Sequence, residues 1–188
     1  MVVLRGKCVV VGDPTVGKTA IAQAYHSDGS AFPKSYSMST GIDLLQKFVQ
    51  LGDDNKEVVD LFVFDSAGRG IFKDLNEASY NKVGMFVIVF DLSSSKSFSN
   101  CQKWLEELKN FFEPGKNIPG ILIGNKCDLK ERRQVDGNKA NAFAVKHNLL
   151  YFECSAKHYE GIDGAFKELA NRYHTLHQEN PESIQQIE

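Results

Sequence analysis

The stretch that decides the fold is residues 12–19, which read Gly-Asp-Pro-Thr-Val-Gly-Lys-Thr and match the pattern G-x-x-x-x-G-K-[ST]. It follows an apolar run at residues 8–11 and precedes a helical pattern at residues 20–26. Glycines let backbone N–H groups approach a phosphate chain closely, and a helix N-terminus adds partial positive charge. Lys18 supplies a point charge for the outer phosphates, and the Thr19 hydroxyl is a ligand suited to Mg²⁺. We therefore predict phosphate contacts from Gly12, Thr15, Val16, Gly17, Lys18, Thr19 and Ala20.

The rest of the chain alternates apolar strands with helical patterns. The apolar runs are short and rich in β-branched residues, at 61–64, 83–90, 118–124 and, more weakly, 150–154. Apolar residues recur with helical spacing at 97–112, 137–147 and 162–178. This alternation is typical of a parallel sheet with helices on both faces.

One segment departs from the alternation. Residues 44–51 and 57–64 are two strand-like runs, joined by residues 52–56, whose composition is typical of a turn. Two runs joined in this way form a hairpin, so one edge strand should be antiparallel. We therefore predict an α/β fold with a six-stranded, mostly parallel sheet, one antiparallel edge strand and helices on both faces.

Length and charge narrow the classes of function. A chain of 188 residues suits one domain, and a hydrophobic content of 42% excludes global disorder. Because 22 basic residues face 24 acidic ones, the net charge is −2, which argues against a nucleic-acid binder. The longest apolar run, residues 85–90, is too short to cross a bilayer. We expect one domain at residues 1–178 and a polar, flexible tail at residues 179–188.

Cysteine usage indicates the compartment. The four cysteines lack the spacing of a metal site, and we expect them to be reduced thiols of a cytosolic protein. No cysteine follows Cys154, and position 2 is Val2 rather than glycine. Because the patterns for prenylation and myristoylation are both absent, we expect no direct membrane anchor.

A second motif follows the apolar run at residues 61–64. It reads Asp65-Ser66-Ala67-Gly68. A carboxylate at the end of a buried strand can reach a magnesium ion, usually through water, and a nearby glycine lets a backbone N–H face the γ-phosphate. We predict Asp65 as a metal ligand and Gly68 as a phosphate contact.

Two further motifs follow the last two strands and suit a nucleotide base. The first is Asn125-Lys126-Cys127-Asp128. An aspartate carboxylate accepts two N–H donors at once, which guanine offers on its Watson–Crick edge and adenine does not. The asparagine amide can bond the other base edge, and the lysine stem can pack on the ring. The second motif is Ser155-Ala156-Lys157, and its backbone N–H groups could donate to the guanine oxygen. The predicted base contacts are Asn125, Lys126, Asp128, Ser155, Ala156 and Lys157.

Together these four motifs, in this order, resemble those of the Ras superfamily of small GTPases, and the resemblance covers residues 4–178. It implies a P-loop NTPase fold that binds GTP or GDP with Mg²⁺. Within the superfamily the chain is similar to Rab proteins at residues 36–43 and 97–105. It is most similar to the Rab-like GTPases of intraflagellar transport, through the Gly-Asp-Pro of residues 12–14 and the segments 34–36, 61–68 and 100–106. The resemblance implies a small β-sandwich protein partner and a location in the cytoplasm, at the cilium or flagellum and its base.

Two positions depart from the pattern of the superfamily. The switch residue that coordinates Mg²⁺ is usually a threonine; here it is Ser39, with Thr40 as the alternative ligand. The residue after Gly68 is usually a glutamine that orients the attacking water; here it is Arg69, so we predict slow GTP hydrolysis.

The sequence leaves two alternatives to an assembly subunit of intraflagellar transport. The first is a conventional Rab GTPase of vesicle trafficking, against which the missing lipid anchor and the missing glutamine both argue. The second is a P-loop kinase acting on a small substrate, which has no use for the motif at residues 125–128.

Overall fold

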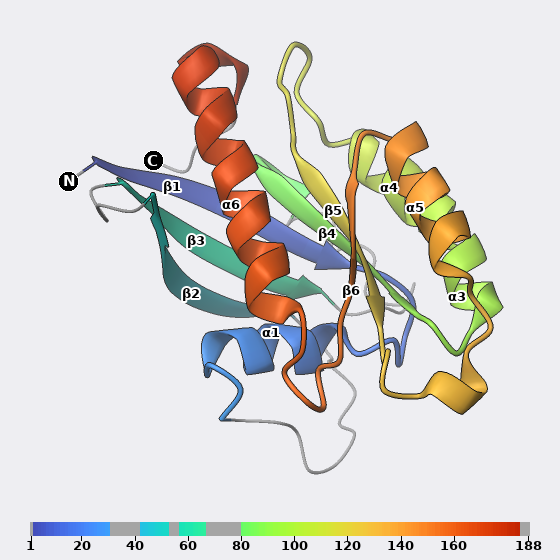
Figure 1. Cartoon of the computed structure of the whole chain (residues 1–188). Helices are drawn as coiled ribbons and strands as arrows, with labels where there is room; N and C mark the ends of the chain where they lie inside the picture. Colours follow the sequence, from blue (N-terminus) through green and yellow to red (C-terminus); the bar gives the residue numbers. More distant parts are fainter. Residues whose placement is uncertain (1, 31–41, 53–56, 67–79, 185–188) are drawn as a thin grey trace.

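The computed structural model in Figure 1 describes residues 2–30, 42–52, 57–66 and 80–184. Its centre is a six-stranded sheet in the order β2-β3-β1-β4-β5-β6, in which β2 and β3 are antiparallel and every other neighbouring pair is parallel. The predicted α/β fold class is therefore confirmed. The strands are β1 (Val2–Val11), β2 (Ile42–Leu51), β3 (Glu57–Ser66), β4 (Met85–Asp91), β5 (Gly120–Asn125) and β6 (Leu150–Glu153).

The predicted hairpin is present at one edge of the sheet. Its register runs from Ile42 opposite Ser66 to Leu51 opposite Glu57, so β2 pairs with β3 along its whole length. Gly52 begins the connection with φ of 70°, a backbone conformation that favours glycine. Because β2 pairs only with β3, the hairpin ends the sheet on this side.

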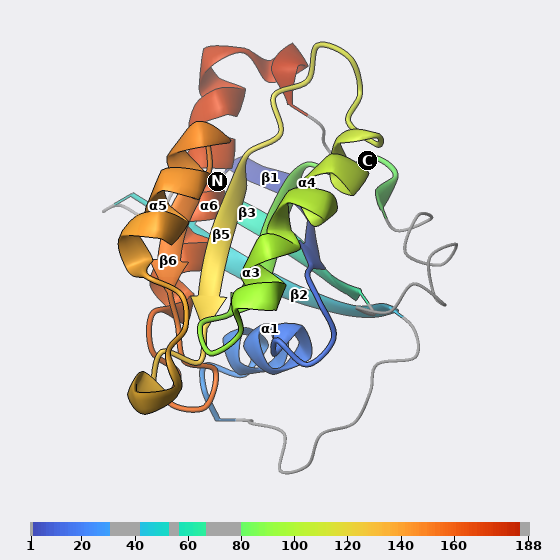
Figure 2. The same cartoon turned by 90° about the vertical axis from the view of Figure 1, so that its right-hand side faces the viewer.

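Helices cover both faces of the sheet, as the near-continuous apolar strands predicted (Figures 1 and 2). Helices α1 and α6 pack on one face, and α3, α4 and α5 pack on the other. All residues of β4 and β5 are buried as a result. The helices are α1 (Lys18–His26), α3 (Ser95–Ser99), α4 (Cys101–Lys109), α5 (Gly137–Lys146) and α6 (Ile162–Glu179).

The helix predicted at residues 97–112 is in fact two helices. The first of them, α3, begins at Ser95, two residues before the predicted start. Its first turn is capped by the Ser94 side chain, which accepts a hydrogen bond from the Ser97 N–H. It is interrupted at Asn100, the single residue between α3 and α4. Periodicity does not reveal this break, because the apolar spacing continues through Asn100 without a change of phase.

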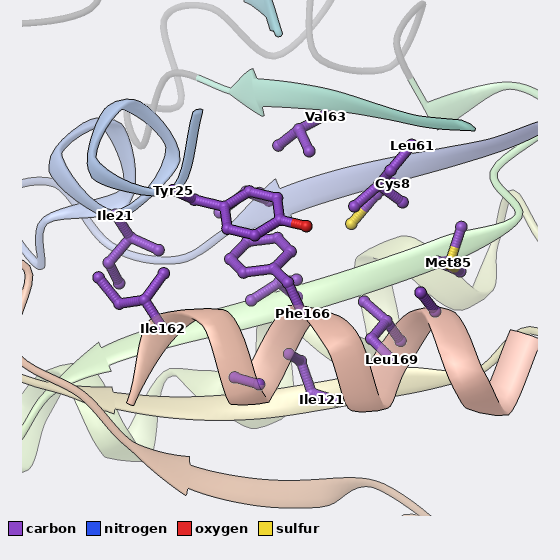
Figure 3. Close-up of a cluster of buried hydrophobic side chains, with 14 of the residues drawn as sticks. Cys8, Ile21, Tyr25, Leu61, Val63, Met85, Ile121, Ile162, Phe166 and Leu169 are labelled. Carbon is purple, nitrogen blue, oxygen red and sulfur yellow. The ribbon is translucent and has the colours of Figure 1, made fainter. Parts of the chain in front are cut away.

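The core on the α1–α6 side is organised around stacked aromatic rings (Figure 3). Tyr25 of α1 lies on Phe166 of α6, with ring centroids 4.1 Å apart and an interplanar angle of 12°. Cys8 lies in the same core and is completely buried, and burial raises the pKa of its thiol. All four cysteines are free, in agreement with the expectation of reduced thiols.

The C-terminal segment packs against the domain as far as Ile184. Asn180 accepts a hydrogen bond from the Glu182 N–H and starts the short 3₁₀ helix Pro181–Ser183. Lys116 donates to the Glu182 carbonyl at 2.6 Å, and Ile184 is only 3% exposed in the core beside α6. The polar composition of residues 179–188 predicts a flexible tail and gives no sign of this burial, because one apolar residue in a polar stretch makes no periodic pattern. No described helix is long and apolar enough to cross a membrane.

Candidate functional site

The loop at residues 12–17 lies between the end of β1 and the start of α1, and two glycines determine its path. Gly12 has φ of 146°, and a Cβ there would lie 2.1 Å from the Val89 carbonyl oxygen. Gly17 has φ of 99°, and a Cβ there would lie 2.3 Å from Asn125 Nδ2. A side chain at either position would therefore displace the loop from its neighbouring strands.

Lys18 lies inside this loop rather than in solvent. Its ammonium donates to the carbonyl oxygens of Gly12 and Asp13, both at 3.0 Å, and the residue is 6% exposed. Burial lowers the pKa of Lys18 to about 8, opposed by the negative charges of Asp65 and Asp13. The two carbonyl groups orient the ammonium without neutralising its charge, so the ammonium can attract an anion such as a phosphate.

Asp65, at the end of β3, faces the first turn of α1. The Thr19 hydroxyl donates to Asp65 Oδ2 at 2.5 Å. Burial raises the pKa of Asp65 to about 6, opposed by the hydrogen bond from Thr19 and the charge of Lys18. Asp65 Oδ1 is buried and has no hydrogen-bond partner among the described residues.

Two hard oxygen ligands, one with a buried oxygen left unsatisfied, are a donor set that fits Mg²⁺ or its coordinated water. A bound Mg²⁺ would supply positive charge for the phosphates. Thr19 and Asp65 would hold it. The other predicted ligand, Ser39, the phosphate contact Gly68 and the departure at Arg69 lie outside the described residues.

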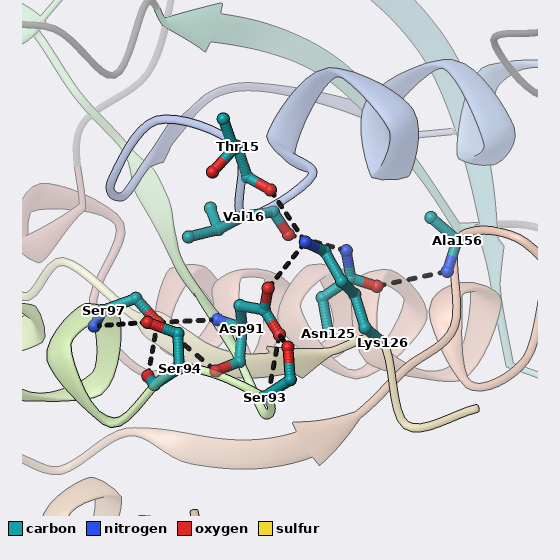
Figure 4. Close-up of polar contacts among 9 residues, drawn as sticks. All are labelled: Thr15, Val16, Asp91, Ser93, Ser94, Ser97, Asn125, Lys126 and Ala156. Atoms are coloured by element: carbon teal, nitrogen blue, oxygen red, sulfur yellow. Dashed lines mark hydrogen bonds and ion pairs between the residues drawn. The ribbon is translucent and has the colours of Figure 1, made fainter. Parts of the chain in front are cut away.

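Asn125 is a bridge between loops (Figure 4). Its Nδ2 donates to the Val16 carbonyl at 2.8 Å, and its Oδ1 accepts from the Ala156 N–H at 3.2 Å. The residue is 2% exposed, and both ends of its amide are engaged by the protein. The sequence predicts that this amide contacts the base edge, and the structure shows in addition that it joins the phosphate loop to the motif at residues 155–157.

Lys126 makes a second bridge to the phosphate loop (Figure 4). Its ammonium donates to the Thr15 carbonyl at 2.9 Å and to Asp91 Oδ2 at 2.6 Å. Although burial opposes the shift, hydrogen bonds from Lys126 and Ser93 hold the pKa of Asp91 below its usual range. Asp91 is not among the residues predicted from the sequence; the available indication is that it ends a buried strand, much as Asp65 lies at the end of β3.

Asp128 and Ser155 also meet. The Ser155 hydroxyl donates to Asp128 Oδ1 at 2.7 Å, and the Cys127 N–H donates to the Cys154 carbonyl at 3.1 Å. The two loops that carry the predicted base contacts therefore lie side by side. Lys157, the remaining predicted contact, is exposed next to them.

A salt bridge between Arg133 and Glu153 also holds these two loops together, on the side away from the phosphate loop. Arg133 Nη1 donates to Glu153 Oε2 at 2.8 Å, and Tyr151 donates its hydroxyl proton to Glu153 Oε1 at the same distance. These hydrogen bonds, the one from Arg133 above all, hold the pKa of Glu153 below its usual range against the effect of burial. The brace connects the segment after Asp128 to the strand that leads into Ser155.

Known proteins that resemble this chain identify its family. The model of the Ras family matches residues 7–175, which is most of the chain. This chain belongs to the Ras family. As a Ras-family GTPase it binds GTP and GDP and hydrolyses GTP, and the resemblance to this family predicted from the four motifs is confirmed.

Individual relatives are similar to this chain over different lengths. The chain is 42% identical to the intraflagellar transport protein 27 homolog of Bos taurus, over all of both chains. It is 43% identical to the Homo sapiens homolog, over 97% of each. It is 38% identical to the Ras-related protein Rab-33A of Mus musculus, over 80% of this chain and 62% of that protein.

Proposed function

We propose that this protein is a Rab-like, guanine-nucleotide-dependent subunit of the intraflagellar transport machinery. The observation that carries the proposal is the extent of the similarity: two relatives named intraflagellar transport protein 27 are matched over 97–100% of both chains. A conventional Rab of vesicle trafficking is the second candidate, but Rab-33A is covered over 62% of its length and Rab-13 over 77%. The proposed location is the cytoplasm, at the cilium or flagellum and its base.

The nucleotide would be held by residues around Asn125 and Lys126, the two side chains that bond to the phosphate loop. Backbone N–H groups of the phosphate loop and the Lys18 ammonium would contact the phosphates, and Asp128 would accept from the guanine edge. Mg²⁺ would be held by Thr19, Asp65 and Ser39. Support for these roles comes from the buried ammonium of Lys18 and the unsatisfied oxygen of Asp65.

Hydrolysis is proposed to be slow, because Arg69 has only hydrogen-bond donors and cannot accept from the attacking water. The bound state of the nucleotide, rather than rapid turnover, would then control assembly. In this respect the protein would act as a subunit whose shape depends on GTP and Mg²⁺ more than as a fast enzyme.

Protein partners are proposed to hold the protein in place, among them a small β-sandwich subunit. Two surfaces are candidates. One comprises residues 39–43 and 72–75, and a partner there would bind in a nucleotide-dependent way. The other is the C-terminal helix at residues 162–178 with its tail, where Lys167 and Glu168 are exposed and far along the chain from the phosphate loop. A partner on α6 would bind with either nucleotide.

One experiment tests both the role and the surface. The protein is loaded with GDP or with a non-hydrolysable GTP analogue, and transport-complex subunits are captured from a ciliated cell extract and compared with capture by a conventional Rab. Recovery of transport subunits by this chain and not by the conventional Rab supports the proposal. Capture that depends on the bound nucleotide indicates the surface at residues 39–43 and 72–75, and capture with either nucleotide indicates α6. Failure to recover them, together with direct binding of the purified chain to anionic vesicles at physiological salt, would overturn it.

A further inference from the structure

Asp13, the second residue of the phosphate loop, is tied to the opposite layer of the fold. Its Oδ2 accepts from Asn100 Nδ2 at 2.7 Å, and its Oδ1 accepts from Trp104 Nε1 at 2.8 Å. The donors lie 87 and 91 residues away in the chain. Asn100 is the single residue between α3 and α4, and Trp104 lies in the first turn of α4.

The charge of Asp13 strengthens this tie. Both oxygens of the Asp13 carboxylate are engaged by neutral donors, and hydrogen bonds to an ionised acceptor are stronger than those between neutral groups. The contacts therefore keep the negative charge directed at α4.

The same residue also touches the phosphate-binding lysine. The Asp13 carbonyl accepts from the Lys18 ammonium at 3.0 Å, beside the Gly12 carbonyl at the same distance. The backbone of Asp13 thus helps to place Lys18, while its side chain is held by α4. A change in the position of Asp13 would move one of the two carbonyl groups that hold the ammonium.

We propose that Asp13 is a positioning residue, whose carboxylate, held by Asn100 and Trp104, fixes the phosphate loop around Lys18 and couples α4 to nucleotide release. The proposal rests on the binding of GTP and GDP but not on a role in transport. It gives a role to Asp13 and to the segment at residues 100–106, neither of which is among the predicted nucleotide contacts.

Variants of Asp13 test the tie through the rate of GDP release. Asp13→Ala removes both hydrogen bonds, and release should accelerate about tenfold or more. Asp13→Asn is the matched control: its Oδ1 still accepts from Trp104, and the Asn100 amide can turn to present its oxygen to the new NH₂ group. This conservative variant should therefore release GDP within about threefold of the wild-type rate. Rescue by the amide separates positioning from a requirement for charge.

Trp104→Phe removes only the N–H donor and retains an aromatic ring in α4. Alone it should accelerate release less than Asp13→Ala, and in the Asp13→Ala background it should have no further effect, because the two residues act through one contact. Trp104 is also the chain's one tryptophan, so its emission reports on the tie. Emission should change on nucleotide removal in the wild type and in Asp13→Asn, but not in Asp13→Ala.

Each outcome decides the proposal. Release from Asp13→Ala at the wild-type rate overturns it, as does equal acceleration by Asp13→Asn or additivity of the two changes. If Asp13→Ala does not fold, the comparison of Trp104→Phe with Asp13→Asn decides in its place. Faster GDP release in Trp104→Phe but not in Asp13→Asn supports the tie, and any other result overturns it. A wild-type chain that retains no guanine nucleotide would contradict nucleotide binding itself, whereas unchanged variants of a nucleotide-retaining chain contradict only the tie.

Discussion

The hydroxyl of Thr19 donates to Asp65 Oδ2 at 2.5 Å and so joins the first turn of α1 to the end of β3. The bond brings together two oxygen ligands that stand 46 residues apart in the chain. It leaves Asp65 Oδ1 buried without a hydrogen-bond partner among the described residues.

Thr19→Asn should weaken GTP binding in the presence of Mg²⁺ by at least about tenfold, because a ligand hydroxyl is lost and a bulkier amide enters beside Asp65. Thr19→Ser, which keeps the hydroxyl, is the control and should bind nearly as well as the wild type. The measurement is the GTP dissociation constant with Mg²⁺ and with EDTA. Binding that is the same in both conditions in the wild type would mean that Thr19 and Asp65 are not metal ligands.

Asp128→Asn should lower the affinity for guanine nucleotides by about a hundredfold. An acceptor-only carboxylate is replaced by an amide that presents a donor to a guanine N–H, and charge-assisted hydrogen bonds are lost. Ser155→Ala, which removes the hydroxyl that bonds to Asp128, should have a smaller effect in the same direction. Competition against labelled GDP measures both, and an unchanged affinity in Asp128→Asn would remove this residue from the base site.

Asn125→Ala should destabilise the protein even without nucleotide. The change leaves the Val16 carbonyl and the Ala156 N–H without their partner, at a cost of about 2 kcal/mol or more in the free energy of unfolding. A residue that only contacts the base would leave the nucleotide-free protein unaffected. Denaturant unfolding of nucleotide-free samples distinguishes these cases, with the exposed Asn141→Ala on α5 as the control for a tolerated substitution.

Arg69→Gln should accelerate GTP hydrolysis. Ras enzymes with the glutamine hydrolyse GTP at about 4 × 10⁻⁴ s⁻¹ unaided. We expect this protein to be about tenfold slower, equivalent to about 1.4 kcal/mol of activation free energy, and the variant to recover the difference. Single-turnover hydrolysis with GTP-loaded protein measures the rates. No gain in Arg69→Gln would show that another residue positions the water.

Glu153 should contribute stability that depends on pH. Its folded-state pKa is held below the usual range by Arg133, so the contribution is present above the pKa of the unfolded chain, about 4.3, and is lost as the pH falls through the folded pKa. Because the pair is about one-third exposed, we expect at most about 1 kcal/mol. The difference in free energy of unfolding between the wild type and Glu153→Gln should shrink between pH 6 and pH 3; a difference independent of pH would contradict this role.

Much of the architecture could be predicted because it depends on local patterns. The alternation of apolar strands and helices indicated the parallel sheet, and the turn composition after Leu51 indicated the antiparallel edge. The break at Asn100 and the burial of Ile184 could not be predicted in this way. Asn100 bonds to Asp13 across 87 residues, and Lys116 bonds to the Glu182 carbonyl beside Ile184 across 66 residues. Neither contact can be read from the local pattern of apolar residues.

The sequence by itself determined the chemistry of the site. The phosphate loop is a contiguous segment whose glycines and lysine act at fixed spacing, and the motifs at the ends of β3 and β5 are equally local. Tertiary structure alone decided how these groups are held. Asn125 reaches Val16 across 109 residues, Lys126 reaches Asp91 across 35, and Trp104 reaches Asp13 across 91. Hydrogen bonds act over about 3 Å, so only the packing of the folded chain determines which distant donor meets which acceptor.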